Sequence, residues 1–376
     1  MKRLNNKPQN KDKNMASKNR IKRLFDLYTS DLSYSEIERL IKKESADVYE
    51  FFTANIPKPN PNENKIRRGF KFFRGVFNAF VLRLTPARRV FYFVALITFF
   101  VGLNSSNSPY LLFAFLLLNL LLAFELADKL NLKSEMDIAS KVQNGLVPNK
   151  PPDNANYFIA SHYEPAKIVS GDYFDFIPLP NGDLYYFIGD ISGKGMSAAL
   201  YMVQVRAIIH SLVHLEYSPK ELLIRLKAIL CSDLRPGNFL TIIASVIKTD
   251  GTFCLSRAGH NTVYHYSPKT NIVKIVSPKG LAIGFNDKGL FATSLEEIKI
   301  TTEPNDIIVF YTDGVTEAMN SGMEQFGEER FKDVIIKNSN KSVSEIRDKI
   351  VRSVFRFRGE NDLSDDLTLT IFKRKE

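Results

Sequence analysis

The sequence predicts an α+β domain in which two β-sheets carry helices on their outer faces, preceded by a pair of membrane-spanning helices. Two observations lead to this prediction. Segments rich in β-branched and aromatic residues dominate the chain from Tyr157 onward and alternate with clustered helical segments. Two uncharged apolar runs, residues 90–103 and 109–124, come before them. A chain of 376 residues has room for both parts.

The basic charge of the chain is concentrated near its beginning. Residues 1–90 contain 21 Lys and Arg against 9 Asp and Glu, whereas the remainder contains 30 against 32. We expect residues 1–20 to form a disordered basic tail, and residues 21–87 to form a cytoplasmic helical basic region with a capping box at Ser33 and Glu36. This distribution favours an anionic membrane surface as a partner and argues against a nucleic-acid-binding domain.

Residues 88–124 are predicted to form a transmembrane helical hairpin. The uncharged runs of 14 and 16 residues are short for a hydrocarbon core of ~30 Å, but Arg88 and Arg89 can extend their charges to the interface. Lys and Arg are frequent before the first run, so the positive-inside rule places that side in the cytoplasm. We therefore expect a two-span protein of the inner (cytoplasmic) membrane with cytoplasmic N- and C-termini. The alternative is a buried helix pair in a soluble domain.

Residues 125–148 are predicted to form an amphipathic linker helix that ends before Pro148. Its apolar stripe either pairs with a second copy of the chain, which would give a homodimer, or packs on the next domain. The helix is too short to be identified as a coiled coil from its pattern alone. The residues of the stripe recur at intervals of four and are Leu126, Leu130, Ile138, Val142 and Leu146.

The remaining residues, 149–376, are predicted to form the domain with the two sheets. Nine segments have the composition of strands: 157–163, 173–179, 184–189, 239–248, 252–258, 262–267, 296–302, 306–312 and 367–373. Four segments have helical patterns: 196–215, 219–234, 328–337 and 342–358.

Aspartates stand beside the ends of four predicted strands. A single Asp next to Gly usually marks a turn. Four such positions, each adjoining an apolar strand, would form an all-oxygen pocket if the strand ends converged. Carboxylates do not crowd together without compensation, and hard cations such as Mg²⁺ or Mn²⁺ provide it. The positions are Asp172, Asp190, Asp313 and the pair Asp365–Asp366.

Other reactive side chains have simpler interpretations. The sequence contains no nucleophile motif and no phosphate-binding glycine loop. Cys231 and Cys254 are isolated and are predicted to be reduced core thiols. His210 and His214 lie one turn apart on an apolar helix, where packing is favoured over metal binding. For His260, in a predicted turn, we expect a structural hydrogen bond.

From Ile138 to Glu376 the sequence resembles the bacterial protein phosphatase 2C-like serine phosphatases, in the branch of the stage II sporulation and sigma-factor-regulator phosphatases. The segments that carry the resemblance include IASKVQNGLVP, YEPAKIVSGDYFDF, IGDISGKGMSAAL, NDIIVFYTDGVTEAMN and DDLTLTIF, in the order of the family. Ser170 and Lys194 depart from residues that are common in the family. The resemblance implies an αββα sandwich with two divalent cations, Mn²⁺ or Mg²⁺, at one end.

The resemblance also implies the roles of individual residues. Asp190 would bridge both cations, and the carbonyl group of Ile191 would bind one of them. Asp313 and Asp365 would complete the shell of the second cation. Asp172 would lie in the metal shell, directly or through water, so that Asp172 and Asp190 are the candidate catalytic residues.

The implied activity is metal-activated attack of water on phosphoserine or phosphothreonine, without a phosphoenzyme. By analogy the substrate is a phosphorylated protein similar to an anti-sigma-factor antagonist. Lys194 would help to hold the substrate phosphate, and the alternative is an ordinary solvated loop lysine. Two other functions stay open: a pseudophosphatase that binds phosphoproteins without turnover, and a membrane scaffold whose domain only dimerises. The retained aspartates argue against both.

Overall fold

The computed structural model describes residues 65–105, 108–285 and 289–376. The predicted tail at 1–20, and the part of the predicted region 21–87 that precedes Lys65, lie outside the described residues. The chain divides into two compact units, Met1–Asp128 and Lys129–Glu376, and each is described by itself.

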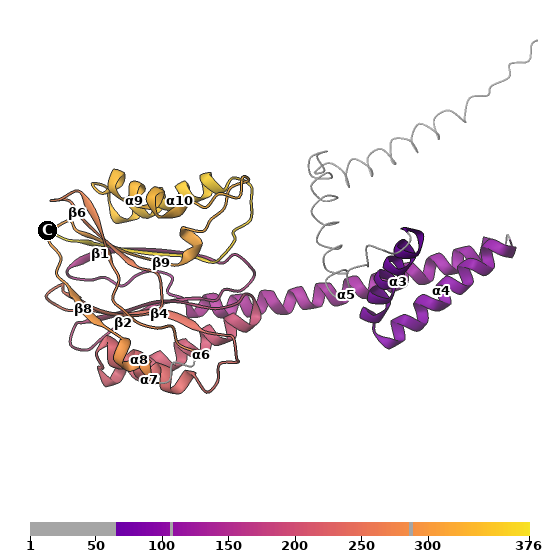
Figure 1. The fold of residues 1–376 in the computed structure, drawn as a ribbon, viewed down its shortest axis with the longest axis horizontal. Coiled ribbons are helices and arrows are strands. Elements are labelled where there is room, and N and C mark those ends of the chain that lie inside the picture. Colours follow the sequence, from indigo (N-terminus) through magenta and orange to yellow (C-terminus); the bar gives the residue numbers. More distant parts are fainter. Residues whose placement is uncertain (1–64, 106–107, 286–288) are drawn as a thin grey trace, which may run out of the picture. The chain divides into compact units, whose positions relative to one another are not determined.

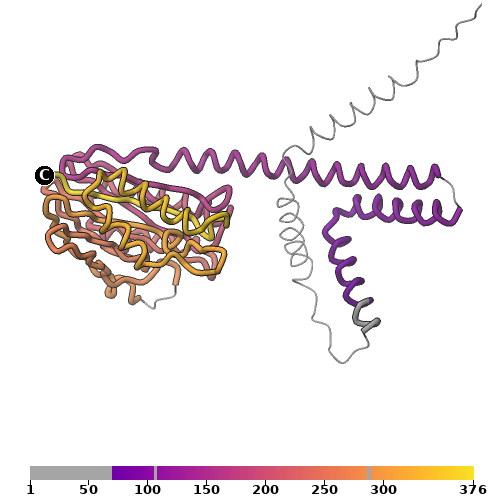
Figure 2. The backbone as a smooth tube through the Cα atoms, turned by 90° about the horizontal axis from the view of Figure 1, so that it is seen from above, coloured from indigo at the N-terminus to yellow at the C-terminus, as the bar shows by residue number. Residues whose placement is uncertain are grey.

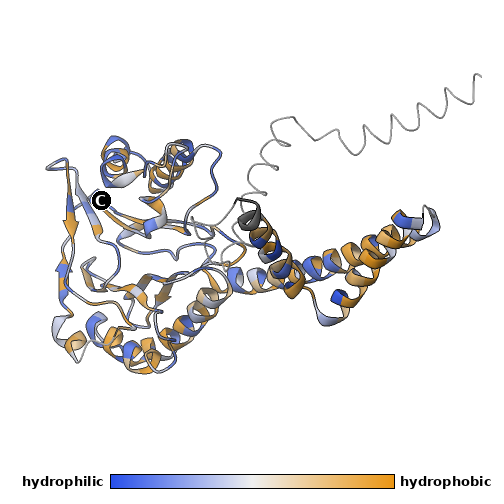
Figure 3. Cartoon of the chain, turned by 45° about the vertical axis from the view of Figure 1, so that its right-hand side comes forward, coloured by the Kyte–Doolittle hydropathy of each residue, from blue (hydrophilic) through white to orange (hydrophobic). Residues whose placement is uncertain are grey.

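The first unit contains the apolar helices of the predicted hairpin. They are α4 (Pro86–Ser105) and the first part of α5 (Ser108–Leu146), preceded by α3 (Lys65–Arg83). Figure 3 shows that α4 and the adjoining part of α5 are mostly apolar on their surfaces. Arg88 at the start of α4 pairs with Glu125 (2.8 Å) and Asp128 (2.7 Å) on α5, so the polar ends of the two helices meet. The helices are therefore antiparallel, as expected of a hairpin.

The linker helix is not a separate element. The sequence predicted a hairpin at 88–124 followed by a helix at 125–148, whereas α5 continues without interruption through 39 residues to Leu146 (Figure 2). The physical reason is the absence of Gly and Pro between Tyr110 and Asn144, so nothing in this segment breaks the helix. The apolar stripe of the linker part is solvent-exposed in the single chain, and Leu130 and Val142 are 56% and 61% exposed.

The second unit contains two five-stranded sheets, and all of their strand pairs are antiparallel. The first sheet has the order β1-β10-β9-β6-β7, and its strands are β1 (Tyr157–Glu164), β10 (Leu367–Arg374), β9 (Ile307–Tyr311), β6 (Val263–Ser267) and β7 (Ile272–Val276). The second has the order β2-β3-β4-β5-β8, and its strands are β2 (Asp172–Pro178), β3 (Leu184–Ile191), β4 (Leu240–Ile247), β5 (Phe253–Ala258) and β8 (Glu297–Ile300).

Helices cover the outer face of each sheet, so the predicted αββα sandwich is confirmed (Figure 1). The first sheet carries α9 (Gly327–Asn338) and α10 (Val343–Arg358). The second carries α6 (Met196–Leu212), a 3₁₀ turn, α7 (Pro219–Leu230) and the short α8 (Leu290–Ser294). The sequence analysis missed α8 and β7. Strand β7 is an edge strand with mostly exposed residues and lacks the alternation of a half-buried strand.

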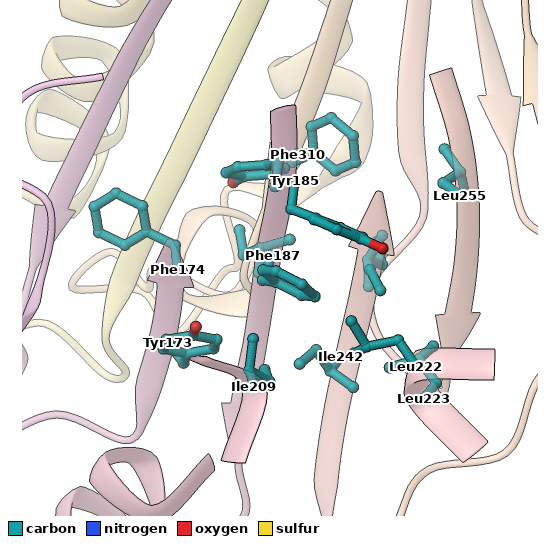
Figure 4. Packing of buried hydrophobic residues seen from close by; sticks show 14 of the residues in the cluster. Tyr173, Phe174, Tyr185, Phe187, Ile209, Leu222, Leu223, Ile242, Leu255 and Phe310 are labelled. Atoms are coloured by element: carbon teal, nitrogen blue, oxygen red, sulfur yellow. The ribbon is translucent and has the colours of Figure 1, made fainter. Parts of the chain in front are cut away.

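Aromatic side chains fill the space between the two sheets, and Phe310, labelled in Figure 4, is one of them. The ring of Tyr186 on β3 lies 4.9 Å from that of Phe310 on β9 and 5.2 Å from that of Phe372 on β10. Each fully buried ring of this size stabilises the fold by roughly 1.5–3 kcal/mol. These contacts fix the two sheets against each other, which in turn fixes the positions of their strand ends. Cys254 is a buried free thiol and Cys231 a half-buried one, close to the prediction.

Candidate active site

The structure brings the predicted aspartate segments to one edge of the sandwich. Asp172 opens β2, Asp190 lies next to the end of β3, and the strand register places the two opposite each other. In the other sheet, Asp313 follows β9 and Asp365 precedes β10, which is the neighbour of β9. Four segments that are far apart in the sequence therefore meet at one end of the domain.

Asp172 links the two sheets. Its carboxylate oxygen Oδ2 accepts a 2.8 Å hydrogen bond from the hydroxyl group of Thr312 and a 2.5 Å hydrogen bond from that of Thr368. Both threonines belong to the sheet opposite Asp172, and Asp172 is only 1% exposed. The two hydroxyl groups hold the carboxylate in one place and offset part of the cost of its burial.

The aspartates form one electrostatic unit. Burial, and then the charges of Asp313 and Asp365, raise the pKa of Asp190 from 3.8 to about 7. Burial, and then the charge of Asp365, raise the pKa of Asp313 to about 6. Burial, and then the charge of Asp190, raise the pKa of Asp172 well above its usual range. Burial and neighbouring carboxylates thus disfavour the ionised forms of Asp172, Asp190 and Asp313, and a bound cation would relieve this repulsion.

Two glycines allow the strand ends to approach each other. A Cβ atom at Gly171 would lie 3.0 Å from the carbonyl oxygen of Ile191 and 3.3 Å from Oδ1 of Asp190. A Cβ atom at Gly314 would lie 2.1 Å from the carbonyl oxygen of Asp366, which is impossible without a shift of backbone. The carbonyl group of Ile191 and the carboxylate of Asp190 therefore lie beside the same glycine, in a space that a side chain would fill.

The adjacent residues Asp365 and Asp366 have different partners. The carboxylate of Asp366 accepts hydrogen bonds from the backbone N–H groups of Ala166 (2.7 Å) and Gly171 (2.8 Å), and so holds the loop that leads into β2. Asp365 instead pairs with Lys194, whose Nζ lies 2.7 Å from Oδ2. Asp366 is therefore a structural residue, and Asp365 is the member of the pair with partly exposed oxygen atoms.

The pocket is open rather than a closed cage of ligands. Within residues 65–105, 108–285 and 289–376, no three His, Cys, Asp or Glu side chains surround a common point as the ligands of one ion would. The nearby donors are carboxylate and carbonyl oxygens, which belong to Asp172, Asp190, Ile191, Asp313 and Asp365. An ion in this pocket would take part of its coordination from water, as Mg²⁺ commonly does.

Three polar residues next to the pocket were missed in the sequence analysis. Two are Thr312 and Thr368, the partners of Asp172. The third is Gln143 in the last turn of α5, which is 3% exposed; its amide donates to the carbonyl group of Ser170 (2.7 Å) and accepts from the N–H of Ser170 (3.0 Å). The sequence carries no local signal for Thr368, because alternation of Leu and Thr usually predicts a polar face toward solvent, whereas both faces of β10 are buried.

The histidines have structural partners. Nδ1 of His260 lies 2.9 Å from the hydroxyl group of Thr241, and burial lowers the pKa of His260 to about 3, so the ring is neutral. The predicted structural hydrogen bond is therefore confirmed. Nε2 of His210 lies 2.7 Å from Oδ2 of Asp175 on β2, a polar contact where apolar packing was expected. No second histidine shares this contact among the described residues.

Two antiparallel sheets between two helical layers, with acidic strand ends at one edge, define the class of the PP2C-like phosphatases. Solved structures with this fold include the SiaA PP2C domain of Pseudomonas aeruginosa (TM-score 0.57, 20% identity, covering 66% of this chain and 98% of that one). Another is the structure of the RsbU and RsbW domains of Rv1364c from Mycobacterium tuberculosis (TM-score 0.53, 22% identity, covering 61% and 63%).

The sequence comparisons identify the family. The model of the family "Stage II sporulation protein E (SpoIIE)" matches residues 180–375. The phosphoserine phosphatase RsbU of Bacillus subtilis (strain 168) is 29% identical over 247 residues, which cover 65% of this chain and 71% of RsbU. The family match spans more than half of the chain, and the chain therefore belongs to the stage II sporulation protein E family. Its fold and family are those of a protein serine/threonine phosphatase.

Proposed function

We propose that the chain is a membrane-anchored, metal-dependent phosphatase that acts on a phosphorylated protein similar to an anti-sigma-factor antagonist. The observation that carries the proposal is the meeting of Asp172, Asp190, Asp313 and Asp365 at one edge of the sandwich, where burial and the neighbouring carboxylates raise the pKa of Asp172, Asp190 and Asp313. Positive charge would stabilise the ionised carboxylates at this site. A phosphate ester is itself negatively charged, so it could bind beside these carboxylates only if cations were present.

The residues of the pocket fit two divalent cations. Carboxylate and carbonyl oxygens are the ligands that Mn²⁺ and Mg²⁺ prefer. Asp190 would bridge the two cations, with the carbonyl group of Ile191 beside it on the first. Asp313 and Asp365 would hold the second, and Asp172 would complete the shell directly or through water. Oxygen ligands alone suit either metal, so both are candidates.

The chemistry divides between the cations and the chain. Bound cations would supply an activated water molecule and neutralise charge on the phosphoryl oxygens. The hydroxyl groups of Thr312 and Thr368 favour the ionised form of Asp172, because each hydrogen bond to its carboxylate lowers the pKa of that group. Lys194 is 42% exposed at the border of the pocket and would offer its ammonium group to the substrate phosphate. No protein nucleophile is required.

The membrane anchor would consist of α4 and the first part of α5. Both are long and apolar enough to cross a membrane, as is the segment Met196–Leu215. The latter is α6 of the phosphatase domain with its 3₁₀ turn, and its residues Met202, Val205 and Ile209 are fully buried in the core. Two spans, with basic residues before the first, would leave both termini in the cytoplasm.

The partners follow from the family and from the linker part of α5. The homologous region of Rv1364c stands next to an RsbW domain, which supports a role in a partner-switching pathway. The exposed apolar stripe of α5 supports a homodimer, because two copies would bury Leu130, Ile138 and Val142 together. The net charge of −2 after residue 90 gives no support to nucleic-acid binding.

Hydrolysis assays test the proposal. Residues 125–376 and the full chain in detergent are given p-nitrophenyl phosphate, and then a phosphorylated anti-sigma-factor antagonist, with Mn²⁺ or with EDTA. We expect turnover that requires the metal and that disappears in Asp190→Asn. Metal-independent turnover would contradict the mechanism. Binding of the phosphoprotein without turnover by either form would make the chain a pseudophosphatase.

A further inference from the structure

Lys194 places a positive charge against the pocket aspartates. Its Nζ is 2.7 Å from Oδ2 of Asp365 and also donates to the carbonyl oxygen of Ser364. The same charge lowers the pKa of Asp313, which shows that Lys194 also acts on the second aspartate of the first sheet. Lys194 therefore stands against the two side chains that would hold the second cation under the proposed function.

An ammonium group at this oxygen atom disfavours a divalent cation at the same place, because both carry positive charge. Oδ1 of Asp365 already accepts a hydrogen bond from the backbone N–H of Asp366, so Oδ2 is the oxygen directed away from the chain's own backbone. A cation that approached Oδ2 while Lys194 remained there would meet a like charge at close range.

We propose that the ammonium group of Lys194 competes with the second divalent cation for Asp365. In the metal-free protein it neutralises part of the acidic pocket, and it leaves when the second cation binds. The inference rests on the proposed function, because it requires a cation site at Asp313 and Asp365. Lys194 would then lower the affinity of the site for the second cation. Its side chain would become free to contact the substrate only after that cation has bound.

The surroundings of Lys194 permit this movement. Its neighbours Gly193 and Gly195 have φ angles of +98° and +82°, and no heavy atom would lie within 4 Å of a Cβ at either position. The side chain of Lys194 is 42% exposed. Release of the ammonium group therefore requires no repacking of the core, and the departing charge enters water.

The expected effect is moderate and has a definite sign. An ion pair with this exposure contributes roughly 0.2–1 kcal/mol, so removal of the lysine should tighten binding of the second cation by about 1.4- to fivefold. Binding of the first cation, beside Asp190 and Ile191, should change less. Misfolding of the variant could not produce tighter metal binding, because damage to the site would weaken the binding of the cation.

Calorimetric titration of the full chain in detergent with Mn²⁺ tests the inference. Lys194→Met removes the charge but keeps the length of the side chain, and Lys194→Arg keeps the charge. Lys248→Met is the matched control, because Nζ of Lys248 lies 2.7 Å from Oδ2 of Asp183, which directly precedes β3 and is not one of the proposed metal ligands. We expect tighter binding of the second equivalent of Mn²⁺ in Lys194→Met, and wild-type affinity in the other two variants.

The outcomes separate this inference from the proposed function. If the wild-type chain binds Mn²⁺ and Lys194→Met binds the second equivalent equally or more weakly, the inference is wrong. A higher KM for p-nitrophenyl phosphate with unchanged Mn²⁺ affinity would also overturn it, and would assign Lys194 to the phosphate alone. If the wild-type chain binds no Mn²⁺ at all, the proposed metal site is wrong, and the inference falls with it.

Discussion

Substitution of Asp190 by Asn should stabilise the metal-free phosphatase domain while abolishing its activity. The pKa of Asp190 is raised from 3.8 to about 7, first by burial and then by Asp313 and Asp365. The folded state therefore binds the proton of Asp190 more tightly than the unfolded state does. As the pH rises from about 4 through 7, this proton is lost and the free energy of unfolding falls.

The size of the effect follows from the pKa. A shift of about three pKa units corresponds to a cost on the order of 4 kcal/mol above pH 8, as an upper limit, since one unit is worth ~1.4 kcal/mol. Asn carries no charge, so this cost disappears in Asp190→Asn. At pH 4.5 the carboxyl group of the folded wild-type protein is mostly protonated and resembles Asn, so the difference between the two proteins should shrink to about 1 kcal/mol there.

Urea unfolding of residues 125–376 in EDTA, at pH 4.5 and pH 8, measures this difference. Asp250→Asn is the control with opposite sign, because Thr252 lowers the pKa of the exposed Asp250 and its removal should bring no stabilisation. The reasoning is refuted if Asp190→Asn is no more stable than wild type at pH 8. Addition of Mn²⁺ should reverse the order, because only the wild-type protein retains the Asp190 carboxylate that would hold the cations under the proposed function.

Three further predictions concern the supports of the site. Thr312→Val removes a hydrogen bond to Asp172 and should weaken Mn²⁺ binding about tenfold. The loss of affinity should be larger at pH 6 than at pH 8. Thr312→Ser keeps the hydroxyl group and should bind Mn²⁺ like the wild type, and calorimetry measures both variants. Gln143→Ala leaves two buried backbone groups without partners and should lower the free energy of unfolding by about 2 kcal/mol in urea titration, and an unchanged midpoint would contradict this. Leu130→Asp with Val142→Asp should convert a dimer to a monomer in analytical ultracentrifugation; an unchanged oligomeric state and rate would rule out the proposed pairing.

Much of the fold could be predicted from the sequence because its signals are local. Strand composition and helical periodicity identified nine of the strands now observed and the main helices, and the structure brings the Asp residues expected at strand ends to one edge of the sandwich. The missed elements carry weak local signals: β7 is an exposed edge strand, and α8 has only five residues. The predicted linker helix at 125–148 is continuous with the second helix of the hairpin, because a change from apolar to charged composition does not end a helix.

The partners of the site could not be predicted, because they depend on contacts between distant segments. The hydrogen bonds of Asp172 join it to Thr312 and Thr368, which lie 140 and 196 residues away in the sequence. The register that sets these contacts follows from the packing of both sheets, and no short window of sequence contains it. The pairing of Lys194 with Asp365 spans 171 positions and belongs to the same group of contacts.

The two adjacent aspartates before β10 suggest how inactive relatives of such an enzyme arise. The two carboxylates have different partners: that of Asp366 holds the loop before β2, and that of Asp365 pairs with Lys194. Loss of Asp365 would leave the hydrogen bonds from Asp366 to Ala166 and Gly171 intact, so the domain would still fold. Natural selection could then retain a folded protein that binds phosphoproteins without turnover. Loss of Asp366 would release the loop itself. A pseudophosphatase should therefore arise more readily by losing the first aspartate of the pair than the second.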